Sequence, residues 1–207
     1  MAGLLSNFRN TIIVSVLLAL IMLYAYATAG GGVDERFWQA LLRWGHVFSG
    51  ILWIGLLYYF NFVQIRKMPD IPAELKPAVS KYIAPEALFW FRWSAMATVV
   101  FGVLIALQRG YLGEVLTFGF LGGFLGGFGA EDRAYALLGI GAWLAIVMFL
   151  NVWGVIWPNQ KIALGIKEAD ADAKAKAGRI AMLGSRTNLL LSIPMLVSMT
   201  FHQTLFG

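Results

Sequence analysis

Cysteine is absent from this sequence of 207 residues. Its absence excludes disulfides, thiolate catalysis, iron–sulfur clusters and covalent attachment of haem through a CxxCH motif. Charged residues are also scarce, at 13%, where soluble domains average about 25%. The net charge of +5 is concentrated in loops between apolar runs, which is typical of membrane topology and argues against a nucleic-acid partner.

Apolar residues make up 59% of the chain, and the mean hydropathy is +0.72. A helix needs about 20 apolar residues to cross a bilayer core of about 30 Å. Five runs meet this length, and the first is longer than the apolar region of a signal peptide, so we expect it to be retained. The sequence therefore predicts one all-α domain over residues 1–207, an integral membrane bundle of about five transmembrane helices. The predicted spans are residues 11–29, 37–64, 87–107, 135–157 and 188–206.

The orientation of these spans is predicted from the basic residues in the loops. The two most basic segments follow the second and the fourth span, and positive loops face the cytoplasm. We therefore expect the N-terminus inside, the C-terminus outside, and a multi-pass protein in the lipid bilayer of the bacterial inner membrane. The basic residues are Arg66, Lys67, Lys76 and Lys81 in the first segment, and Lys161, Lys167, Lys174, Lys176, Arg179 and Arg186 in the second.

Two segments between the spans need a separate interpretation. Residues 115–129 form a short near-repeat of phenylalanine and glycine, and their six glycines disfavour a helix. We expect an outer loop that is re-entrant or lies on the bundle, with a flexible hydrophobic loop as the alternative. Residues 167–186 combine alanines with alternating charges, which indicates an interfacial or solvated helix.

Polar residues inside a membrane span are costly, so each one is a candidate for function. The second and fifth spans each carry a polar stripe at helical spacing, and each stripe contains one of the two histidines of the chain. Both histidines are predicted to lie in the outer leaflet. The stripes are Arg43, His46, Gly50, Trp53, Leu57, Asn61 and Gln64 in the second span, and Asn188, Leu191, Met195, Ser198 and His202 in the fifth.

Two imidazoles at similar depth on two helices suit the axial ligation of one b-type haem. On this hypothesis His46 and His202 ligate the haem iron, Gly50 lets the macrocycle approach, and Arg43 pairs with a propionate. Two alternatives stay open. The histidines can serve as structural hydrogen-bond partners between helices. They can also bind copper or zinc, with Met195 as a possible soft ligand.

A second polar cluster is predicted at the inner side of the membrane. One interpretation is interhelical hydrogen bonding, worth about 0.6 kcal/mol per bond on average. The other is a polar pocket or a proton path. The cluster comprises Asn61, Gln64, Arg92 and Asn151, together with Asn159 and Gln160.

Four motifs in this sequence resemble the membrane domain of the membrane-bound urate oxidases, also called cytochrome-c-linked urate hydroxylases. They are RWGHVFSGILWIGLLYYFNFVQ (residues 43–64), APEALFWFRWSAMAT (84–98), NVWGVIWPNQ (151–160) and SRTNLLLSIPMLVSMTFH (185–202). The resemblance spans most of residues 37–202. It implies a multispanning oxidoreductase domain that hands electrons to a cytochrome c.

Members of that family resemble this chain followed by a c-type cytochrome, and a sequence without cysteine cannot carry a covalent haem c. We therefore expect a membrane redox protein that passes electrons to a separate cytochrome c or another membrane subunit. The alternatives are a non-redox accessory subunit of a larger membrane complex and, with less support, a transporter. No catalytic residue is assigned.

Overall fold

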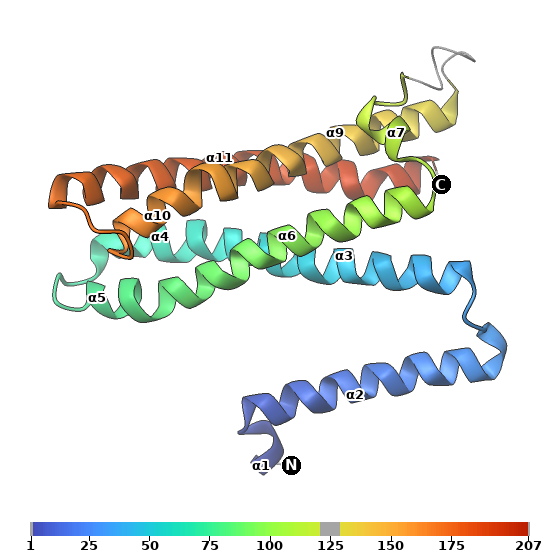
Figure 1. Cartoon of the computed structure of the whole chain (residues 1–207), viewed down its shortest axis with the longest axis horizontal. Helices are drawn as coiled ribbons and strands as arrows, with labels where there is room; N and C mark the ends of the chain where they lie inside the picture. Colours follow the sequence, from blue (N-terminus) through green and yellow to red (C-terminus); the bar gives the residue numbers. More distant parts are fainter. Residues whose placement is uncertain (1, 121–128, 207) are drawn as a thin grey trace. The chain divides into compact units, whose positions relative to one another are not determined.

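The computed structural model describes residues 2–120 and 129–206, and within these ranges the chain is helical with short turns (Figure 1). It divides into two compact units, Met1–Leu41 and Leu42–Gly207. The division falls inside α3 (Glu35–Tyr58), which contributes residues to both units.

The first unit is dominated by one long apolar helix, and its elements are α1 (Ala2–Leu5), α2 (Phe8–Tyr26) and η1 (Ala27–Gly31). The side chain of Asn7 caps α2 by accepting a hydrogen bond from the backbone N–H of Asn10 at 3.1 Å. Gly32, with a φ of 68°, follows the last helical residue. Only glycine adopts this conformation without strain, so the chain turns here before α3 begins.

The second unit is built on α3, α6, α9 and α11, and Figure 1 draws these four long helices alongside one another. Short helical segments join them or extend their ends. The elements after α3 are η2 (Tyr59–Gln64), α4 (Ile65–Lys67), η3 (Met68–Asp70), α5 (Lys76–Ala78), η4 (Val79–Ile83), α6 (Ala84–Gln108), α7 (Leu112–Leu116), α9 (Ala130–Asn151), η5 (Val152–Ile156), α10 (Trp157–Ala163) and α11 (Ala171–Phe206).

Five helices are long and apolar enough to cross a membrane, as the sequence predicted. All five predicted spans lie wholly inside these helices. The helices continue beyond the apolar runs, because helical hydrogen bonding persists where the chain leaves a membrane. The five are Phe8–Gly31, Glu35–Asp70, Lys76–Gln108, Asp132–Ala163 and Ala171–Phe206.

The last helix differs from the prediction. Residues 171–186 are helical as expected, but they continue without a break into the fifth span instead of forming a separate interfacial helix. The side chain of Asp170 accepts a hydrogen bond from the backbone N–H of Ala173 at 2.7 Å, which caps the helix there. Because alanine and lysine are strong helix formers, the helix then extends directly into the apolar run.

The glycine-rich segment is described only in part. Its first two residues belong to α7, and the chain then turns at Phe118 and Gly119, which have φ values of 58° and 70°. The rest of the predicted loop, residues 121–128, lies outside the described residues.

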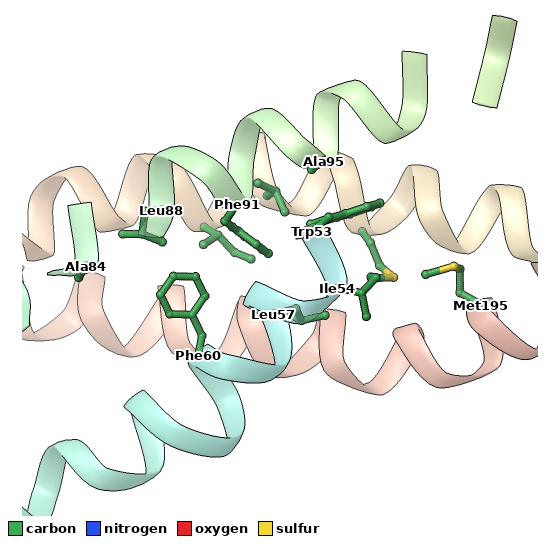
Figure 2. Close-up of a cluster of buried hydrophobic side chains, with 12 residues drawn as sticks. Trp53, Ile54, Leu57, Phe60, Ala84, Leu88, Phe91, Ala95 and Met195 are labelled. Carbon is green, nitrogen blue, oxygen red and sulfur yellow. The ribbon is translucent and has the colours of Figure 1, made fainter. Parts of the chain in front are cut away.

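The apolar core of the second unit lies between α3, α6, α9 and α11. Figure 2 shows Phe60 of the second span beside Phe91 of α6. The rings of Phe60 and Phe91 meet edge to face, with centroids 5.6 Å apart. Trp53 and Leu57 are fully buried in this cluster.

Candidate functional site

A cavity of about 470 Å³ opens at the end of the second unit where α6 and α11 end and α9 begins. The basic loops lie at the opposite end (Figure 1). Its lining combines two arginines, two tyrosines and a histidine, and among the described residues that line it none is a carboxylate. The lining residues are Arg43, Arg109, Tyr111, Ala134, Tyr135, Leu138, His202, Gln203 and Phe206.

The polar side of this cavity is positively charged and aromatic. The guanidinium of Arg109 lies 5.9 Å from the ring centroid of Tyr111, whose ring is 5.7 Å from that of Tyr135. Burial raises the pKa of the Tyr111 hydroxyl, while the charges of Arg109 and Arg43 act in the opposite direction. The hydroxyl is therefore neutral near pH 7 and able to donate a hydrogen bond, so the cavity suits a ligand with negatively charged oxygens.

His202 enters this lining from α11 with one ring nitrogen already engaged. Its Nδ1 lies 2.9 Å from the backbone carbonyl oxygen of Met199. A carbonyl only accepts, so the proton is assigned to Nδ1, and Nε2 has the lone pair that a metal would bind. Within residues 2–120 and 129–206, Nε2 of His202 has no hydrogen-bond partner.

His46 has the same arrangement on a different helix. Its Nδ1 lies 2.8 Å from the backbone carbonyl oxygen of Thr98 in α6, which again assigns the proton to Nδ1 and leaves a lone pair on Nε2. The ring packs against Gly102, where an added Cβ atom would lie 3.1 Å from Cε1 of the imidazole. These two contacts fix the orientation of the ring between α3 and α6.

The structure brings together some of the predicted haem residues and separates others. Arg43 and His202 line the same cavity, whereas His46 of α3 is absent from the lining and its ring lies against α6. Gly50 also faces α6, where an added Cβ atom would be 3.8 Å from Cγ2 of Thr98. The residue types are those that a b-type haem uses, two imidazoles with Nδ1 engaged and two arginines, but of the two histidines only His202 lines the cavity.

The amides of the inner polar cluster connect helices. Nδ2 of Asn61 donates to Oγ of Ser185 at 2.8 Å, which links the second span to α11. Nδ2 of Asn151 donates to Oδ1 of Asn188 and to the carbonyl of Gly184, both at 2.8 Å. These contacts are of the interhelical kind, and they pair α9 with α11 at a defined register.

Arg92, which the sequence placed in the same cluster, has a different environment. Its guanidinium carbon lies 3.4 Å from the centroid of the Trp157 ring, and the residue is only 8% exposed. Its Nε and Nη1 are buried without a hydrogen-bond partner. Oε1 of Gln64 is likewise buried and unpaired. The structure therefore does not join Arg92 to the amide network.

Several residues of these sites were not predicted from the sequence. Arg109 and Tyr111 follow the third span, and Tyr135 opens the fourth, so each was assigned to a loop or a helix end. Trp157 was expected only near the end of a span. An arginine followed two residues later by a tyrosine, between two spans, was the available signal for the cavity. Within the described ranges, no group of three or more His, Cys, Asp or Glu side chains could hold a metal ion.

Comparison with known families adds one finding. Residues 128–204 match the model of a family described as urate oxidase N-terminal, which confirms the predicted resemblance over that range. Two of the four motifs, and with them His202, fall inside the match, whereas His46 and Arg92 precede it. No curated protein and no solved structure matches the chain.

Proposed function

We propose that the chain, whose residues 128–204 match the model of the urate oxidase N-terminal family, is a membrane redox protein. It binds one b-type haem through His46 and His202. It passes electrons between a carrier on the outer side and a separate cytochrome or partner subunit. The bound haem would supply one-electron transfer.

The observation that carries this proposal is that both histidine rings make the same hydrogen bond, from Nδ1 to a backbone carbonyl. In each ring Nδ1 lies within 2.9 Å of a backbone carbonyl oxygen, which leaves Nε2 available. Hydrogen bonding of the second nitrogen is the usual way in which a protein orients a metal-ligating histidine and raises its basicity. His46 and His202 are also the only histidines in the sequence.

The arginines of the cavity have a separate role in the proposal. Arg43 and Arg109 line the cavity that His202 enters, and the described residues of this lining include no acidic side chain. Their guanidinium groups would hold the two propionates by charge-assisted hydrogen bonds. Gly50 would let the macrocycle approach α3, and Gly102 makes room for the ring of His46.

The proposed orientation follows from charge. Residues 66–81 and 161–186 carry ten of the 16 basic residues, and the loops within these two segments lie at the same end of the second unit (Figure 1). Positive loops stay in the cytoplasm, so this end faces inward. The cavity with His202 then opens toward the periplasm of a bacterial inner membrane, where a soluble cytochrome c would be accessible.

An absorption spectrum of the purified protein tests the proposal. We expect a sharp α-band on dithionite reduction in the wild type and its loss in both His46→Ala and His202→Ala. Arg43→Gln should keep the band but weaken haem retention during purification. Thr204→Ala is the matched control, because this residue lies on the exposed part of α11 close to His202.

The outcomes separate the candidate functions. If only one histidine variant loses the band, ligation by both residues is wrong and a single axial histidine is indicated. A colourless wild-type protein, expressed with sufficient haem, contradicts the redox proposal. The accessory-subunit interpretation then takes its place.

A further inference from the structure

Arg92 lies in α6, about 12 Å from Ala84, the residue at which the helix begins. Ala84 is at the end of the second unit that carries the basic loops. At 8% exposure it is among the buried residues of the second unit. A guanidinium in such a place is costly unless an anion or a set of acceptors compensates its charge. The identity of that compensating group is therefore the question that Arg92 raises.

The described protein supplies no such group. Nε and Nη1 of Arg92 are buried without a hydrogen-bond partner, although three buried amide oxygens of the same polar cluster are unpaired too. The salt bridge between Lys67 and Asp70 lies in an exposed turn and does not include Arg92. What Arg92 does contact is the face of Trp157, which partly offsets the loss of water but leaves the N–H donors free.

A second cation lies on the same indole. Nζ of Lys161 is 5.6 Å from the centroid of the Trp157 ring, one helical turn further along α10. Two positive charges on one aromatic ring repel each other unless an anion lies between or beside them. Lys161 is partly exposed, so this anion can enter from outside the bundle.

We propose that Arg92, Lys161 and Trp157 form a binding site for one phosphate oxyanion, supplied by the headgroup of an anionic phospholipid or by a soluble phosphate. Arginine offers a planar fork that matches phosphate oxygens, and lysine adds a point charge. Basic pockets between transmembrane helices at the cytoplasmic side commonly hold lipid headgroups. The site is separate from the haem cavity, and it does not rest on the redox function.

Thermal unfolding in lipid nanodiscs tests the site and its source of phosphate. Wild-type protein is compared in phosphatidylcholine discs with increasing phosphatidylglycerol, and separately in phosphatidylcholine discs with inorganic phosphate. A ligand that binds the folded state raises Tm with its concentration. We expect a rise with phosphatidylglycerol, and about tenfold weaker apparent binding in Arg92→Gln and in Lys161→Gln. Native mass spectrometry counts the bound phospholipids in the same samples.

Two further variants keep the test decisive. Arg92→Lys retains the charge without the fork and should bind less tightly than wild type, which also covers the case in which Arg92→Gln does not fold. Lys81→Gln removes one exposed positive charge elsewhere at the same end and should bind like wild type. An equal loss in this control would show general surface attraction and overturn the site.

The two arms identify the ligand. A response to phosphatidylglycerol that depends on Arg92 and Lys161 assigns the site to a lipid headgroup. The same dependence with inorganic phosphate alone assigns it to a soluble anion. Equal binding by wild type and both glutamine variants in both arms overturns the proposal. These results do not depend on whether the protein binds haem, so a failure of the redox proposal would leave them unchanged.

Discussion

The imidazole of His46 lies against the backbone of Gly102, so closely that a Cβ atom at residue 102 would be 3.1 Å from Cε1 of the ring. The carbonyl oxygen of Thr98, 2.8 Å from Nδ1, also holds the ring from α6. The position of this histidine is thus set by a single face of α6. A substitution on that face of α6 should therefore move the His46 ring.

The first prediction follows from this contact. Gly102→Ala should displace the His46 ring and destabilise the protein by about 1 kcal/mol, because overpacking outweighs the better helix propensity of alanine. If haem is bound, its reduced α-band should also shift or weaken. Gly55→Ala is the control, since no atom lies within 4 Å of the added Cβ, and it should be neutral or stabilising. Thermal unfolding and a reduced spectrum of both variants give the answer, and equal behaviour would contradict the prediction.

The second prediction concerns the contact between α9 and α11. A Cβ atom at Gly141 would lie 2.7 Å from Oγ of Ser198, whose hydroxyl donates to the carbonyl of Leu137. Gly141→Ala should therefore push the two helices apart or break this hydrogen bond, at a cost of about 1–3 kcal/mol. Chemical unfolding in mixed micelles measures the loss. Gly154→Ala has open space around the new atom, and a similar loss there would show that the effect is not due to packing.

The third prediction concerns the amide pair that joins the same helices. Asn188 is fully buried, accepts from Asn151 at 2.8 Å, and donates to the carbonyl of Met148 at 3.0 Å. A double-mutant cycle of Asn151→Ala and Asn188→Ala should give a coupling energy of about 0.6 kcal/mol, the average for such bonds in membranes. The same cycle with exposed Thr187→Ala in place of Asn188→Ala should show no coupling. Additive effects of the two asparagine variants would count against a direct bond.

The fourth prediction concerns alkaline pH. Burial raises the pKa of Tyr111 above its ordinary value of about 10, so the folded state disfavours the phenolate. The contribution of this group to stability is complete below about pH 10 and is lost as the pH rises further, because only the unfolded chain ionises readily there. Tyr111→Phe should therefore lose less stability between about pH 9 and pH 11 than wild type. Tm measured across this range decides the question, with exposed Tyr82→Phe as the control.

Arg109 modifies the same titration. Its positive charge lowers the pKa of Tyr111, although burial has the larger effect. Removal of the charge in Arg109→Gln should raise that pKa further and move the alkaline loss of stability to higher pH. A shift to lower pH would show that Arg109 does not act on Tyr111 through its charge.

The five long helices could be predicted because a membrane span is recorded in consecutive residues. Apolar length and basic loops are properties of one helix at a time. The ends were less predictable, as α11 shows. Residues such as Lys174 and Arg179 mark the end of the apolar run, but they do not interrupt helical hydrogen bonding, so the helix begins at Ala171.

The candidate site was predictable to the extent that it lies on one helix face. Helical spacing in the sequence predicted the polar stripe that contains Arg43 and His46, and the similar polar stripe that ends at His202. The partners of these residues depend on how each helix is rotated against its neighbours, which periodicity does not encode. The contact of His46 with the backbone carbonyl of Thr98 is one example of such a partner. Every residue has a backbone carbonyl, so the sequence does not mark this one. The contact of the Trp157 ring with Arg92 is another example.

The length of α11 has a practical consequence. Its 36 residues extend over about 54 Å, whereas a bilayer core is about 30 Å thick, so several turns at its beginning lie in water. Those turns precede Pro194, the proline inside α11, and form a continuous helical rod up to that residue. A marker domain fused to Ala171 through an uninterrupted helix would therefore keep a fixed orientation to the bundle, and would provide the mass that particle alignment of so small a membrane protein requires.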